Sequence, residues 1–196
     1  METFPKAVTL KDGAKLTLKV MDESDIDDVI EFFQGIHDDD RLYLRMDTSN
    51  PENVKRRFGK VNYDVMFPIM AVADERIVGI STLYRASFGW RRNLGELRVV
   101  IDRKFQRRGL ATVLTKELFF QALKNKLYKI QAELMENQHS AIAAFERLGF
   151  RREATLKRHV TDNDGKRQDL IIMTLDVEDL WYLMEDYVKT PDFRIH

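Results

Sequence analysis

Alternating hydrophobic and polar residues predict two β-hairpins in the first half of the chain. Residues 7–20 form two alternating runs around an Asp-Gly pair at 12–13. Such a pair between alternating runs is a strong hairpin signal. Residues 69–86 repeat the pattern, and the turn is expected at Glu75 and Arg76. Four further strands are expected, at residues 95–102, 128–135, 150–159 and 169–175.

Apolar residues at helical spacing predict five helices. These are expected from residues 22–24 to about 34, 51–58, about 110–126, about 140–148, and 177 to about 188. The polar stretch 35–50 is expected to be a loop. Strands that alternate with helices indicate an α/β or α+β domain built on a mixed sheet.

The composition fits one globular domain of 196 residues, 44% of them hydrophobic. Thirty-two basic and 32 acidic residues cancel, whereas proteins that bind nucleic acids or membrane surfaces gain affinity from surplus positive charge. Neither nucleic acid nor a membrane is therefore expected as a partner. We expect one folded domain at residues 1–176 and a helical extension at 177–196. The broad apolar face of that extension would pack on the domain or form a homodimer contact.

Missing residue types narrow the chemistry. The chain has no cysteine, which excludes disulfides, thiolate metal ligands and a thiol nucleophile. Its four histidines are widely separated, so no metal site is expected. The N-terminus lacks a signal-peptide core, and the longest apolar stretch, residues 65–73, is half a membrane span. We therefore expect a cytoplasmic protein.

The segment from Gln106 to Ala111 carries the clearest chemical signal. It lies between an expected strand and an expected helix, and Gly109 lets the backbone turn sharply and approach a ligand. The first N–H groups of that helix lack partners, and no Ser, Thr, Asp or Asn stands at the cap. Four cations flank this helix start: Arg103, Lys104, Arg107 and Arg108. The segment suits a phosphate or pyrophosphate, and an ordinary turn with solvated arginines is the alternative.

This segment resembles the Q/R-x-x-G-x-G/A loop of the GNAT N-acetyltransferase superfamily, whose backbone amides hold the pyrophosphate of acetyl-coenzyme A. Residues 95–118 follow the strand, loop and helix order of that family. Residues 137–150 resemble its second coenzyme-contacting helix, which ends in Gly-Phe. Residues 11–25 and 43–46 are also similar to the subgroup that contains bacterial protein-lysine acetyltransferases.

The resemblance implies a GNAT fold, with a mixed, mostly antiparallel sheet of about six or seven strands flanked by helices. Acetyl-coenzyme A would be the co-substrate, without a metal, and would lie between two diverging central strands. A backbone donor near residues 99–101 would bind the thioester carbonyl. The implied coenzyme contacts are Val99, Val100, Ile101, Gln106, Arg107, Arg108, Gly109, Leu110, Ala111, Thr112, Asn137, Gln138, Ser140 and Phe145.

Glu96 is the candidate general base for an amine acceptor. It is the only acid within the strand that precedes the loop, and its spacing to Gly109 resembles that of the family's lysine acetyltransferases. The alternative is a structural glutamate paired with Arg98 or another cation. Glu133, on the next strand, is the second candidate base.

The expected activity is direct acetyl transfer to a primary amine, with a protein lysine favoured over a protein N-terminus or a small amine. Phe145 stands where many relatives place a tyrosine that protonates the leaving thiolate. That departure favours the alternative function, a non-catalytic acyl-coenzyme A sensor.

Overall fold

The computed structural model describes residues 4–179, and it confirms the expected mixed, mostly antiparallel α/β fold. The strands are β1 (Lys6–Thr9), β2 (Lys15–Val20), β3 (Met66–Ala73), β4 (Arg76–Arg85), β5 (Leu94–Ile101), β6 (Lys129–Met135), β7 (Arg151–Thr161) and β8 (Arg167–Asp176). The α-helices are α1 (Ile26–Gln34), α2 (Asp38–Arg41), α3 (Pro51–Phe58), α4 (Leu110–Lys124) and α5 (His139–Arg147). Single 3-10 turns precede α1 and α4, at Glu23–Asp25 and Arg103–Phe105.

The described strands form one sheet in the order β1-β2-β3-β4-β5-β6-β8-β7. Every neighbouring pair is antiparallel except β5 and β6, which run parallel. The sheet therefore has the eight strands that the local patterns predict, whereas the family resemblance implied about six or seven; the short β1 forms one edge by pairing with β2.

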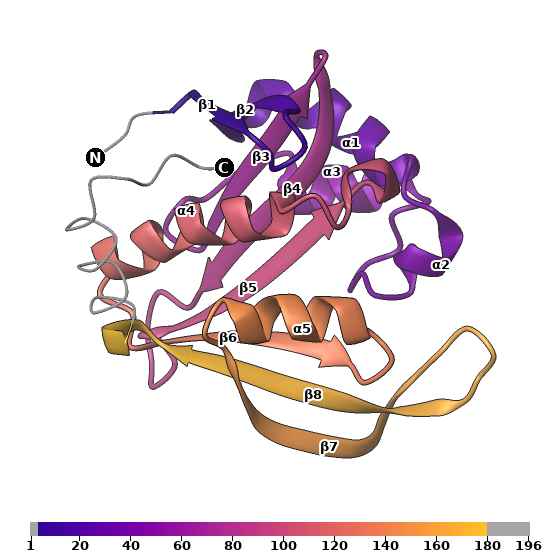
Figure 1. Cartoon of the computed structure of the whole chain (residues 1–196), viewed down its shortest axis with the longest axis vertical. Coiled ribbons are helices and arrows are strands. Elements are labelled where there is room, and N and C mark those ends of the chain that lie inside the picture. The colour runs from indigo at the N-terminus through magenta and orange to yellow at the C-terminus, as the bar shows by residue number, and fades with distance from the viewer. Residues whose placement is uncertain (1–3, 180–196) are drawn as a thin grey trace.

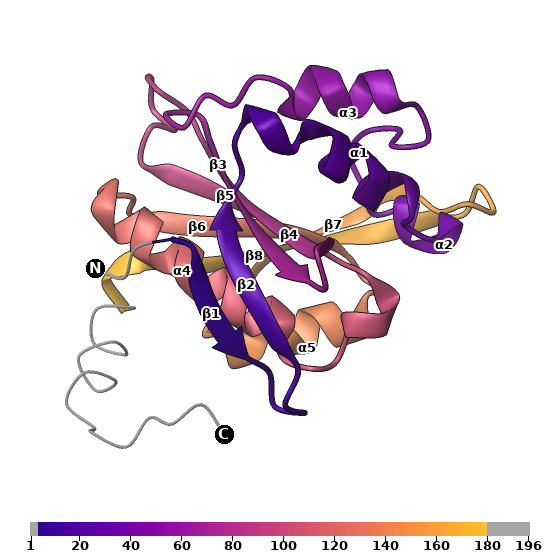
Figure 2. The same ribbon diagram turned by 90° about the horizontal axis from the view of Figure 1, so that it is seen from above.

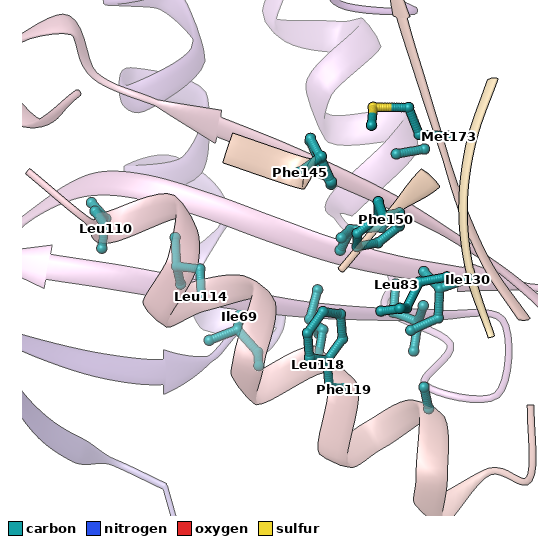
Figure 3. Close-up of a cluster of buried hydrophobic side chains, with 14 of the residues drawn as sticks. Ile69, Leu83, Leu110, Leu114, Leu118, Phe119, Ile130, Phe145, Phe150 and Met173 are labelled. Carbon is teal, nitrogen blue, oxygen red and sulfur yellow. The ribbon is translucent and has the colours of Figure 1, made fainter. Parts of the chain in front are cut away.

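Two hydrophobic layers cover the two faces of the sheet. Figure 2 shows α1, α2 and α3 on one side and α4 and α5 on the other. The first layer packs Phe33 of α1 and Phe58 of α3 against residues such as Met70 and Ile80. In the second layer, the leucines of α4 pack towards the sheet beside Phe145 and Phe150 (Figure 3). This separation follows from strand geometry, because successive side chains of a strand point to opposite faces.

Three sequence-based expectations need correction or lie outside the described residues. The stretch 35–50 is not all loop, because α2 forms within it, with His37 at its N-cap accepting from the N–H of Asp39. The turn of the second hairpin lies one residue earlier than expected, at Asp74 and Glu75, which both have positive φ. The helix expected at 177–188 is helical at residues 177–179, and the remainder lies outside the described residues.

The pairing of β5 with β6 is short and then stops. It covers Leu94 with Lys129, Gly95 with Ile130, and Glu96 with Gln131. Beyond Glu96 the two strands diverge towards their C-terminal ends (Figure 1), and this opening is called the fork below.

Gly95 lies at the paired base of the fork and is closely covered by side chains. A Cβ at this position would lie 2.8 Å from both Leu127 Cδ1 and Leu83 Cδ1. Real Cβ atoms do not make contacts this short, so a side chain here would push two core leucines away.

Gly95→Val is therefore expected to lower the free energy of unfolding by about 1–3 kcal/mol, the usual cost of overpacking a core. Gly35→Ala is the control, because its Cβ would meet only ordinary contacts at 3.5 Å and its φ is −75°. Chemical denaturation of the two variants measures the difference. Equal unfolding free energies would show that the leucines adjust without cost.

Candidate functional site

A large groove runs through the fork. Its volume is about 3030 Å³, which exceeds the range of about 300–1,000 Å³ typical of small-molecule pockets. Its lining comes from both faces of the sheet, with Arg45 and Tyr84 on the side of α1 and α3, and Gly109 and Ser140 on the side of α4 and α5. A groove with these walls has room for one long ligand and a second molecule that meets it at the fork.

The segment before α4 forms an uncapped helix start beside this groove. Gly109 is the N-cap residue in the left-handed conformation, with φ 91°, and no side chain caps the helix. The first N–H groups of α4 therefore keep their capacity to donate to a ligand. Leu110 is 1% exposed and its side chain packs in the core. Only the backbone of Leu110 can therefore face the groove.

The arginines of this segment divide into two kinds. Arg108 donates from Nε to the Asp12 carboxylate and from Nη1 to the carbonyl of Lys104 at 3.2 Å. The hydrogen bond from Arg108 holds the pKa of Asp12 below its usual value. Arg103 pairs with Asp39 at 3.1 Å and Asp40 at 2.6 Å, and these contacts raise the pKa of Arg103.

Those two arginines hold the loop against the β1–β2 turn and α2. Arg107 is exposed, and it lines the groove together with Arg108. The sequence alone did not distinguish these cations from one another. In the structure, two of them, Arg103 and Arg108, are paired with carboxylates.

Strand β5 presents backbone donors to the fork. The N–H of Asp102 donates to the carbonyl of Val78 on β4 at 3.0 Å. Because donors alternate between the two edges of an antiparallel strand, the N–H groups of Val99 and Ile101 point to the opposite edge. That edge has no β6 partner beyond Glu96, so these groups face the fork.

Two carboxylates lie across the fork from one another and share a cation. Glu96 on β5 and Glu133 on β6 have side chains that are 21% and 22% exposed. Nη1 of Arg45 lies 3.0 Å from Oε1 of Glu96, and Nη2 contacts Oε2 of Glu133. Glu96 also accepts from Nε of Arg98 at 2.9 Å, so the structural pairing with Arg98 considered from the sequence is present.

Aromatic and cationic side chains extend this wall of the groove. Two guanidinium groups lie over the ring of Tyr84, with Arg57 at 4.4 Å and Arg98 at 4.7 Å from its centroid. A cation over an aromatic ring is attracted by the electron-rich face of the ring. This arrangement fixes Arg98 beside Glu96.

On the other side of the fork, α5 contributes a backbone terminus and a buried ring. Oε1 of Gln138 accepts from the N–H of Met135 at 2.9 Å, which fixes the turn that leads from β6 into α5. Phe145 is 9% exposed, and its ring meets Phe150 edge to face at 4.9 Å. Phe145 is therefore a core residue whose exposed edge reaches the groove.

The predicted site residues gather in one place. All of them line the groove except Leu110. Sequence reasoning missed Arg45, Arg57 and Tyr84, although Tyr43 to Met46 was noted for its resemblance to a subgroup. No local pattern marks these three residues, because each reaches the site through contacts distant in sequence.

Among residues 4–179, no cluster of three or more His, Cys, Asp or Glu side chains could hold a metal ion. In the same range, no helix has both the length and the hydrophobicity needed to cross a bilayer.

Because Phe145 packs against Phe150, Phe145→Ala is expected to lower the free energy of unfolding by about 3–5 kcal/mol. Glu146→Ala, at the next and exposed position of α5, is expected to change it by about 0.5 kcal/mol or less. Denaturant unfolding of both variants tests this. A loss below about 1 kcal/mol for Phe145→Ala would contradict a core role.

Comparison with known proteins agrees with this geometry. Over 79 residues the chain is 33% identical to the [ribosomal protein bS18]-alanine N-acetyltransferase of Escherichia coli K12. The matched segment makes up 40% of this chain and 53% of that protein. The chain thus matches about half the length of this curated relative. An acetyltransferase of the GNAT family from Streptococcus pneumoniae superposes with a TM-score of 0.71 at 18% identity, over 82% of this chain and 98% of that one.

The crystal structure of the Escherichia coli ribosomal-protein-S18-alanine N-acetyltransferase gives a TM-score of 0.65 at 18% identity, covering 83% of this chain and 94% of that one. At these identities the structural likeness shows a shared fold. The sequence profile of the Acetyltransferase (GNAT) family matches residues 29–150, which is more than half of the chain. With the uncapped helix start and the fork in the same range, the chain belongs to the acetyltransferase (GNAT) family.

Proposed function

We propose that this protein transfers an acetyl group from acetyl-coenzyme A directly to a primary amine. The observation that carries the proposal is the fork, where an uncapped helix start, free backbone donors and two carboxylates meet in one groove. The family uses acetyl-coenzyme A as its co-substrate. No acyl-enzyme is proposed, because the chain has no cysteine and no recognisable Ser–His pair.

The residues from Gln106 to Thr112 fit a pyrophosphate. A helix N-terminus carries partial positive charge and N–H groups without partners, and both favour a phosphate. Arg107 adds a full positive charge beside it. Nε2 of Gln106 donates to the carbonyl of Ile101 at 3.2 Å, which ties this loop to the end of β5. Asn137 and Gln138, in the turn before α5, and Ser140, in its first turn, would contact the same ligand.

Glu96 is proposed as the general base, with Glu133 as the second candidate. A lysine amine has a pKa of about 10.4, so at pH 7 only about one in 2,500 is unprotonated, a cost of about 4.6 kcal/mol. A carboxylate at the fork that accepts this proton, directly or through water, removes much of that cost. Both glutamates face the fork, and only measurement of each variant separates them.

The backbone of β5 would stabilise negative charge on the thioester oxygen. The N–H groups of Val99 and Ile101 are held in place by the pairing of β5 with β4, so they need no reorganisation during the reaction. The departing thiol has a pKa near 8.5, and leaving as a thiolate at pH 7 costs only about 2 kcal/mol. A phenylalanine at position 145 is therefore compatible with transfer.

Two acceptors have separate support. The resemblance of residues 11–25 and 43–46 to lysine acetyltransferases favours a protein lysine. The similar Escherichia coli protein is named as an alanine N-acetyltransferase, which favours a protein N-terminus. Peptides that carry either a single lysine or a free N-terminal alanine, incubated with the protein and acetyl-coenzyme A, decide between them.

The coenzyme site is tested at Gly109. Gly109→Ala is expected to weaken acetyl-coenzyme A binding at least tenfold in calorimetry, because a residue with a Cβ rarely adopts φ 91° and the loop must shift. Gly165→Ala is the matched control, with φ 76° and no atom near its Cβ, in a hairpin turn whose residues do not line the groove. Equal binding by the two variants would remove the loop from the coenzyme site.

The base is tested by amide substitutions. Glu96→Gln is expected to lower kcat for amine acetylation by about 10²–10⁴-fold with unchanged coenzyme affinity. Glu133→Gln is measured beside it, and Glu136→Gln, exposed and outside the groove, is the control. If Glu96→Gln keeps the wild-type rate and Glu133→Gln does not, Glu133 takes the role. If none of the variants differs, neither glutamate is the base.

The alternative function is a sensor that binds acyl-coenzyme A without chemistry. Phe145, in place of a tyrosine acid, is the observation in its favour. It predicts coenzyme binding with no acetylated product from either peptide, whereas a transferase gives product from at least one.

A further inference from the structure

The guanidinium group of Arg45 occupies the space between the two carboxylates of the fork. It contacts Glu96 and Glu133 at once, although they stand on different strands. Arg45 lies between α2 and α3, outside the regular helices. Its side chain is 41% exposed, about twice as much as either glutamate. The cation therefore reaches in from the surface onto two recessed acids.

Both carboxylates have a second partner that does not depend on Arg45. Nε of Arg98 donates to Glu96 at 2.9 Å, and Arg98 is itself held over the ring of Tyr84. Nε2 of Gln131 donates to the free oxygen of Glu133 at 2.9 Å. If Arg45 moves away, the two acids keep these partners, and two carboxylates with one remaining cation, Arg98, leave the site with a net negative charge.

An aliphatic amine that approaches this fork is a cation at pH 7. Its ammonium group and the Arg45 guanidinium carry the same charge and donate to the same oxygens, so they compete for one position. Partly exposed ion pairs contribute little net stability, and the exchange of one cation for the other is therefore inexpensive.

We propose that Glu96 and Glu133 together bind the ammonium group of the acceptor, and that Arg45 holds this position in the free protein. The inference rests on the proposed function and narrows its substrate class to aliphatic primary amines that bind as cations. Loss of Arg45 from the fork also removes a positive charge from beside the base, which favours uptake of the proton.

The test uses n-butylammonium chloride as the probe, titrated at pH 7 while the backbone amide signals of β5 and β6 are followed by NMR. Arg45→Gln is expected to bind it at least fivefold more tightly than the wild type. Arg76→Gln, an exposed arginine outside the groove, is expected to match the wild type. The neutral isostere n-butanol should bind all three proteins equally.

Unchanged or weaker binding of n-butylammonium to Arg45→Gln would overturn the inference. Adding Glu133→Gln to Arg45→Gln should abolish the gain, and persistence of the gain would equally count against the paired carboxylates. Arg45→Met, which keeps the aliphatic part of the side chain, replaces Arg45→Gln if that variant unfolds.

Peptide acetylation by the wild type is measured separately. Tighter binding without acetylated product would reject the proposed function and keep the cation site. Product without tighter binding would keep the proposed function and reject the cation site.

Discussion

The site depends on one constraint, the end of hydrogen bonding between β5 and β6 after Glu96. A fully paired sheet would leave no donors at this edge and no passage between its faces. Gly95 sets the base of the opening, because it lets Leu83 and Leu127 close over the last paired residues. The antiparallel pairing of β5 with β4 continues to Ile101, so the free edge remains rigid without a second neighbour. Strand β5 is thus held by β4 along one edge and lacks a β6 partner along the other. This places fixed N–H donors next to an open groove.

Local patterns in the sequence predicted most of the fold. Alternation in residues 7–20 and 69–86 and helical spacing in 110–126 depend on short-range geometry, which one sequence displays directly. The expectation that residues 35–50 are all loop was wrong because the sequence marks α2 only weakly. The four residues of α2 are too polar to show a periodic face, and their first turn is capped by His37, an unusual capping residue.

The candidate site was predictable only where a contiguous segment carries the chemistry. Residues 106–112 combine a glycine, cations and a helix start, and these features are visible together. Arg45 and Glu133 stand 88 positions apart and meet only because the sheet is folded. Phe145 was notable in the sequence only as a departure from a tyrosine acid. In the structure its ring packs on Phe150, and because a phenylalanine has no proton to donate, it cannot take that acid role.

The contacts of Arg103 and Arg108 have a consequence for the edge of the sheet. Arg108 reaches the turn between β1 and β2, and Arg103 reaches α2, so one loop joins two segments that are otherwise far apart in sequence. Edge hairpins usually open locally at a lower free energy than the rest of a domain. A ligand that binds only the ordered loop also stabilises the two segments that this loop contacts, the turn between β1 and β2 and α2. Occupancy of the groove is thereby linked to amide hydrogen-exchange protection in the N-terminal hairpin.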